Sequence, residues 1–285
     1  PPPFFARSNP RPVLPFLGML QLTVRELRAK KVIWGLFLIS SLVLLIVTFA
    51  LNLDVVDGTL ASARIFGAEA TGGIDLENLV FAVQSIVAGA AYWLGILLAL
   101  FASGPIFTTL LTKGHIDLLL SKPISRTRLL TGHVGGVWLT MLGLCVYLLG
   151  GIWLIMSLKA EVWNARFLLS IPIVLSMFGV MYGVIVAIGS FTRSTALSLI
   201  VTYGLIVASL GLAAVTQITE QLGFVSKAVF LTLYHTLPNF TEVTTIVSKL
   251  SQGEPVSDWY PFLSSILFGA ACYLIGGIKF YRRDF

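Results

Sequence analysis

Few side chains in this sequence could perform chemistry, and none has the spacing of a known catalytic or metal centre. His115, His133 and His235 lie far apart, and neither the H-E-x-x-H zinc motif nor the G-x-S-x-G nucleophile motif occurs. The dipeptide Gly-Lys is absent, so the chain lacks the G-x-x-x-x-G-K-[ST] loop that holds nucleotide phosphates. The sequence therefore predicts no catalytic residue, no metal site and no cofactor in this chain.

Ionisable side chains also avoid the middle of every long apolar stretch. Buried charges in a membrane are costly, and they usually belong to proton relays or to ion-coupled carriers. Their absence argues against a transporter that is driven by a proton or ion gradient.

The composition indicates that most of the chain lies in a membrane. Charged residues make up 11% of the 285 and apolar residues 56%, whereas soluble domains have roughly 25% charged residues. Such a chain cannot cover a soluble core with a charged surface. The net charge of +6 is therefore interpreted as a signal of orientation in the bilayer and not of nucleic-acid binding.

Six segments are long and apolar enough to cross a membrane, which takes about 20 residues. They are Val32–Leu51, Ala82–Phe107, Thr131–Leu158, Phe167–Phe191, Ala196–Val215 and Tyr260–Phe280. In lipid each segment must satisfy its own backbone hydrogen bonds, so helices are expected. The predicted fold class is an all-α integral membrane protein with six transmembrane helices.

The distribution of basic residues predicts the orientation. With both termini in the cytoplasm, all Lys and Arg lie on the inner side except Arg64, Lys159, Arg166, Lys227 and Lys249. Because inner loops of membrane proteins are enriched in Lys and Arg, we expect a multi-pass protein of the cell (inner, cytoplasmic) membrane with both termini cytoplasmic.

Two accessory elements are expected beside the spans. Residues 1–31 are interpreted as a cytoplasmic arm and an amphipathic interfacial helix, although the first span could simply start early, and residues 32–285 as one six-span domain. The outer segment 216–259 is too long for a simple connection, and Pro238 interrupts its apolar middle. It predicts a re-entrant or interfacial helix pair before span six.

Weakly polar and small residues inside the spans have two interpretations each. A translocation pathway could be lined by Gln84, Ser85, Ser103, Ser198, Thr202 and Tyr203; alternatively, such side chains bond back to their own helices. The small residues Gly179, Gly183 and Ala187 recur every four positions and predict close helix packing, either within one subunit or across a dimer.

The loop 108–130 is the most distinctive segment. It is basic, yet it holds an apolar run at Ile116 and Leu118–Leu120 in a region expected to face the cytosol or lipid headgroups. Pro123 would end this short helix, and Ser125 could cap the next one. An exposed apolar edge needs a partner surface, although contact with lipid alone would also satisfy it.

From Gly114 to Arg126 the loop reads G-H-I-D-L-L-L-S-K-P-I-S-R. This stretch resembles the pattern G-T-x-E-x-L-L-x-x-P-[ILV]-S-R between spans two and three of the type-2 ABC transporter permeases, the six-span membrane subunits of many exporters. His115 replaces the usual Thr, and Asp117 replaces the usual Glu. The layout of spans and accessory helices resembles that family over essentially the whole chain.

The resemblance implies a permease subunit of an ATP-driven ABC transporter, with exporter-like topology, that provides half of a translocation pathway. Its expected partners are ABC ATPase subunits that hold ATP and Mg²⁺, a second permease copy or paralogue, and the lipid bilayer, with no nucleic acid. The loop would be a cytoplasmic coupling helix whose contacts with the ATPase come from Gly114, Ile116, Asp117, Leu118, Leu119, Leu120, Pro123 and Arg126. The alternatives are a non-transporting scaffold subunit of a larger assembly and a secondary transporter.

Overall fold

The computed structural model describes residues 13–29, 31–56, 59–65, 68–69, 76–111, 125–216 and 223–282, and helices dominate them. The helices are α1 Val13–Ala29, α2 Lys31–Ala50, α3 Leu76–Ala90, α4 Ile96–Leu110, α6 Arg126–Cys145, α7 Gly151–Ala160, α8 Ser170–Thr192, α9 Thr195–Thr216, α10 Phe224–Thr236, α11 Phe240–Ser251 and α12 Tyr260–Tyr281. A π-helical turn at Ala91–Gly95 joins α3 to α4, and another at Val146–Gly150 joins α6 to α7. A 3₁₀ turn at Ala165–Leu169 leads into α8.

The predicted membrane helices are confirmed. In the described ranges, five helices are long and apolar enough to span, and a shorter apolar helix, Ile33–Phe49, forms most of α2. The five are Leu76–Leu110, Arg126–Ala160, Ala165–Thr192, Thr195–Ala214 and Tyr260–Tyr281.

The second and third spans are longer than the sequence predicted. Each has 35 residues, which at 1.5 Å per residue gives roughly 52 Å, against about 30 Å of hydrocarbon. The apolar stretches Ala82–Phe107 and Thr131–Leu158 mark only their middle parts. The extensions carry polar residues, such as Glu77 and Arg126, that end an apolar run without ending a helix.

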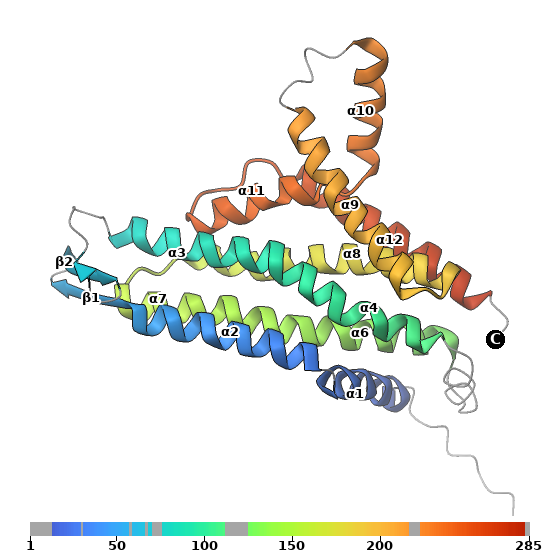
Figure 1. The fold of residues 1–285 in the computed structure, drawn as a ribbon, viewed down its shortest axis with the longest axis horizontal. Coiled ribbons are helices and arrows are strands. Elements are labelled where there is room, and N and C mark those ends of the chain that lie inside the picture. Colours follow the sequence, from blue (N-terminus) through green and yellow to red (C-terminus); the bar gives the residue numbers. More distant parts are fainter. Residues whose placement is uncertain are drawn as a thin grey trace, which may run out of the picture.

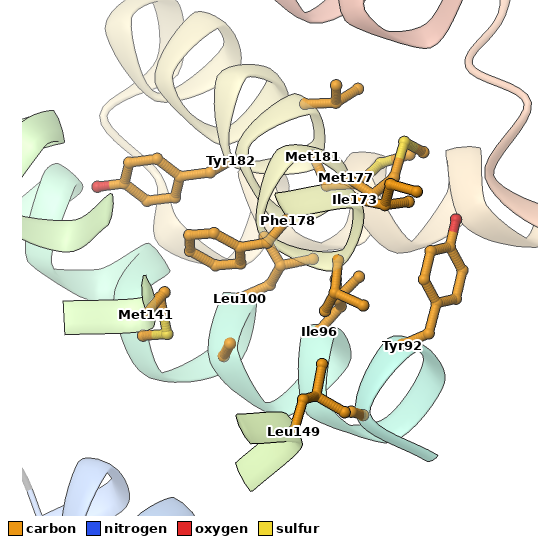
Figure 2. Close-up of a cluster of buried hydrophobic side chains, with 14 of the residues drawn as sticks. Tyr92, Ile96, Leu100, Met141, Leu149, Ile173, Met177, Phe178, Met181 and Tyr182 are labelled. Atoms are coloured by element: carbon orange, nitrogen blue, oxygen red, sulfur yellow. The ribbon is translucent and has the colours of Figure 1, made fainter. Parts of the chain in front are cut away.

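The core of the bundle lies around α8, which is the most deeply buried of the candidate spans. It packs against α12, α9, α4 and α6. Figure 2 shows side chains from α8, including Met177 and Phe178, meeting Ile96 and Leu100 of α4 and Met141 of α6. Because surrounding lipid is as apolar as these side chains, close van der Waals packing is what holds such helices together.

A small antiparallel sheet, which the sequence analysis did not anticipate, follows α2. Its strands are β1 Leu51–Val56, β2 Thr59–Ile65 and β3 Ala68–Glu69, in the order β1-β2-β3. Val56 pairs with Thr59, so two residues connect β1 to β2, and the sequence there is Asp57-Gly58. Asp-Gly between two β-prone runs is a strong hairpin signal that was overlooked.

The predicted helix pair before the last span is present as α10 and α11. Pro238 lies between them, where it cannot continue a helix. The two helices differ in packing. α11 buries Phe240, Val243, Ile246, Val247 and Leu250 against the bundle, whereas α10 leaves Phe224 and Val225 exposed. In Figure 1, α10 and the end of α9 project away from the other helices.

The predicted helix before the first span is also a separate element. α1 lies against α6 and runs in a different direction from α2 (Figure 1). Its Thr23 and Leu27 are fully buried, whereas Arg25 is exposed. α1 is therefore amphipathic in the structure as well as in the sequence.

Candidate functional site

The loop that the sequence analysis predicts to be the coupling helix connects α4 to α6. Residues Gly114, Ile116, Asp117, Leu118, Leu119, Leu120 and Pro123 lie outside the described residues, because these omit 112–124. Its two anchors are described. Leu111 follows the last residue of α4 and is 1% exposed, and Leu129 in the first turn of α6 is also 1% exposed. The chain therefore enters and leaves the loop at residues that are buried in the bundle.

Ser125 caps α6 as predicted. Its Oγ accepts a hydrogen bond from the backbone N–H of Arg128 at 3.4 Å, and its backbone is extended. A hydroxyl at this position satisfies one of the N–H groups that the first turn of a helix leaves without a partner. This cap therefore stabilises the start of α6 at the end of the loop.

Contacts at this end join the helices that flank the loop to the rest of the bundle. Arg126 donates from Nη1 to the carbonyl oxygen of Tyr281 at the end of α12, 3.2 Å away. Thr108 of α4 and Thr195 of α9 share a hydrogen bond between their hydroxyls. The start of α6 is thus tied to α12, and the end of α4 to α9.

α1 is joined to the same end. Thr23 Oγ1 lies 3.3 Å from Nδ1 of His133, and both residues are buried. Leu27 of α1 belongs to the hydrophobic core. A movement of α6 therefore has to carry α1 with it.

The pathway candidates are bonded within the chain. Ser103, Ser198 and Thr202 are fully buried, and each hydroxyl donates to the carbonyl four residues earlier in the chain. Tyr203 donates to the carbonyl oxygen of Leu97 at 2.9 Å and so links α9 to α4. These four residues lie on two helices that pack together, α4 and α9.

Gln84 and Ser85 lie apart from the other candidates, nearer the other end of the bundle. Gln84 is fully buried, and its Oε1 accepts from Nδ2 of Asn164 at 2.9 Å. Among the described residues, the Gln84 Nε2 and Ser85 Oγ atoms have no hydrogen-bond partner within the chain. The six pathway candidates thus form two groups and no single lining.

Asn164 is the polar residue that the sequence analysis missed. Its Nδ2 donates to Gln84 Oε1, to the carbonyl of Leu250 at 3.3 Å and to the carbonyl of Ser251 at 3.0 Å. Its Oδ1 accepts from the N–H of Phe167 at 3.3 Å. Asn164 therefore joins α3, the start of span four and the end of α11. In the sequence its only signal was that an Asn before an apolar run can cap a helix.

The small residues of α8 pack against helices of the same chain. A Cβ on Gly179 would lie 2.0 Å from the ring of Trp138, and a Cβ on Gly183 would lie 3.1 Å from the carbonyl of Gly269. A Cβ on Gly276 would lie 3.0 Å from Cα of Ala187. The close approaches are therefore made to α6 and α12, and two glycines of α12 complement those of α8.

In the ranges that the structure describes, no group of three His, Cys, Asp or Glu side chains could hold a metal ion. Cys145 and Cys272 are free thiols in spans three and six.

The comparisons identify the family. The model of the ABC-2 family transporter proteins matches residues 20–285, which include every described span and the loop 108–130. No curated protein matches the chain. A helical bundle of this layout that matches the family model over nearly its full length is a multi-pass membrane permease. The chain therefore belongs to the ABC-2 family of transporter proteins.

Proposed function

We propose that the chain is the permease subunit of an ATP-driven exporter, that it provides half of the translocation pathway, and that it works with two ATPase subunits and a second permease. The family match over residues 20–285 is the observation that carries the proposal. The sequence adds that the chain has no nucleotide-phosphate loop and no ionisable group in the middle of a span. Energy must then come from a bound ATPase.

Coupling would act through the anchors of the loop. Closure of the ATPases would push on Asp117–Ser121, and the buried anchors Leu111 and Leu129 would transmit that push to α4 and α6. The bond from Arg126 to Tyr281 and the bond between Thr108 and Thr195 extend the movement to α12 and α9. Packed helices shift as rigid bodies, so a displacement at the loop would rearrange the spans.

The orientation belongs to the same proposal. The ends of α4 and α12 and the start of α6 lie together at one end of the molecule, with the β1–β2 hairpin at the other (Figure 1). The sequence segments assigned above to the inner side, which include the loop, hold most of the Lys and Arg residues. By the positive-inside rule, the end at which α4 ends and α6 starts faces the cytoplasm, where ATPases are found.

The test is purification of the full chain in mild detergent, with mass spectrometry of the proteins that remain bound. The wild type should retain an ATPase and hydrolyse ATP. Asp117→Lys should lose both while eluting as a folded membrane protein. Glu254→Lys, the same type of charge reversal on an exposed residue at the opposite end, should keep both. Retention of the ATPase by Asp117→Lys would overturn the coupling role.

A second candidate function, a membrane scaffold without transport, has one observation in its favour. Ser103, Ser198 and Thr202 are fully buried and bonded to their own helices, so they line no open passage within one copy. ATP hydrolysis separates the two functions, because a scaffold would show none that depends on the loop.

A further inference from the structure

An apolar crevice of about 590 Å³ opens between α1, α2 and α6. Val24 of α1, Trp34 and Phe37 of α2 and Leu139 and Gly143 of α6 line it. The volume is in the range of small-molecule sites, which is roughly 300–1,000 Å³. Because its lining is almost entirely hydrocarbon and aromatic, the ligand must present an apolar chain.

Aromatic contacts shape this crevice. The rings of Phe37 and Tyr147 stack with centroids 4.9 Å apart, and Trp34 meets Phe37 edge-on at 6.1 Å. The hydroxyls of Ser41 and Tyr147 lie 2.9 Å apart and bridge α2 to the π-helical turn after α6. The crevice therefore lies in the wedge where α2 approaches α6, next to the junction with α1.

Positive charge borders the apolar lining at that junction. Arg25 follows the lining residue Val24 and is exposed. Lys31, also exposed, lies three residues before Trp34 and so on the same side of α2. The sequence from residue 25 to 31 is R-E-L-R-A-K-K, which holds four basic residues in all against the single acid Glu26. A ligand with a negative headgroup and an apolar tail is complementary to this arrangement.

We propose that the crevice binds an anionic phospholipid of the inner leaflet, with an acyl chain against Trp34 and Phe37 and the phosphate near Arg25 and Lys31. Bulk lipid could fill any groove in a membrane protein, but the basic junction adds a preference for negative headgroups. The inference rests on the proposed orientation and is independent of the transport role.

Trp34 provides the readout, because it lines the crevice and is 60% exposed. The full chain with its bound partners is placed in phosphatidylcholine bilayers that contain phosphatidylglycerol with brominated acyl chains, or the same amount of brominated phosphatidylcholine. Bromine quenches tryptophan on contact, and the signal of Trp34 is the difference between wild type and Trp34→Phe. We expect several-fold stronger quenching of this signal by the anionic lipid.

Matched variants separate headgroup recognition from general lipid contact. Replacing Arg25 and Lys31 together by Gln should abolish the preference, whereas Lys227→Gln, at an exposed lysine of α10, should keep it. Gly143→Leu should reduce quenching by both lipids, because a Cβ at Gly143 meets nothing within 4 Å and the larger side chain can occupy the crevice. Gly89→Leu, another glycine with open space, is its control.

Equal quenching of Trp34 by the two brominated lipids would overturn the proposal, as would a preference that survives the double Gln substitution. The double Gln variant changes only exposed side chains, so the test stands even if Gly143→Leu does not fold. ATP hydrolysis by the same samples reports on the transport role separately, so failure of lipid binding and failure of the proposed function are distinguishable.

Discussion

Adding a single methyl group at Gly179 should destabilise the bundle measurably. Tyr273 of α12 donates its hydroxyl to the Gly179 carbonyl at 2.9 Å, and Trp138 of α6 donates from Nε1 to Tyr273 Oη at 3.2 Å. A Cβ on Gly179 would lie 2.0, 2.6 and 2.7 Å from three atoms of the Trp138 ring. Gly179→Ala must therefore displace that ring and break its bond to Tyr273.

The magnitude follows from these contacts. Overpacking of a filled core costs roughly 1–3 kcal/mol, and the lost hydrogen bond costs about 1 kcal/mol net. Alanine regains roughly 0.5–1 kcal/mol through its higher helix propensity. We expect a net destabilisation of about 1–3 kcal/mol, which lowers an unfolding midpoint by roughly 2–4 °C per kcal/mol.

The assay is thermal unfolding in detergent, followed by the fraction of protein that remains monodisperse. Trp138→Leu removes the clashing ring, so in the Trp138→Leu background Gly179→Ala should lower the stability of the bundle little or not at all. Gly204→Ala is the control, because a Cβ there meets nothing within 4 Å. If Gly179→Ala is equally destabilising with Trp138 and with Leu at position 138, the reasoning from the close contact is refuted.

Three further predictions concern α11 and its neighbours. Asn164→Ala should destabilise the bundle by about 1–3 kcal/mol and so lower the unfolding midpoint, because the buried Ser251 carbonyl and Gln84 Oε1 lose the donor that Asn164 supplies; an unchanged midpoint would contradict this. Tyr92→Phe removes the hydroxyl that donates to the Phe240 carbonyl, and hydrogen exchange at the start of α11 should become faster, at a cost of about 1–3 kcal/mol. Burial and the hydrogen bond to Glu242 raise the pKa of Tyr234 in the folded chain. As the pH rises, the unfolded chain therefore loses the Tyr234 proton at a lower pH than the folded chain does. The free energy that protonated Tyr234 contributes to folding should be intact below about pH 10 and decline above it. Tyr234→Phe should remove this decline from the pH dependence of the unfolding midpoint.

The spans and their accessory helices could be predicted because a bilayer imposes length and hydropathy on each of them. Helix ends were less predictable. The apolar pattern ends where side chains leave the hydrocarbon, but the backbone bonds of α3 and α6 continue into polar sequence at Glu77 and Arg126. The β1–β2 hairpin was missed because its signal, Asp57-Gly58, is short and follows directly on an apolar helix.

The hydrogen-bond partners could not be predicted, because they depend on helix rotation and depth. Asn164 and Gln84 are 80 positions apart, and no periodic pattern connects them. The spacing of Gly179 and Gly183 predicted close helix packing, but only the structure shows that Trp138 of α6 and Gly269 of α12 are their neighbours. The roles of the coupling-loop residues Gly114–Pro123 stay predictions.

The central claim is that an external ATPase drives this chain through the loop near Leu119. It is tested most directly by placing a photo-reactive amino acid at position 119 and irradiating intact membranes. The account predicts a covalent adduct between this chain and a nucleotide-binding subunit, formed on the cytoplasmic side. Irradiation without any ATPase adduct, together with labelling of position 119 by a membrane-impermeant reagent added outside the cell, would contradict it.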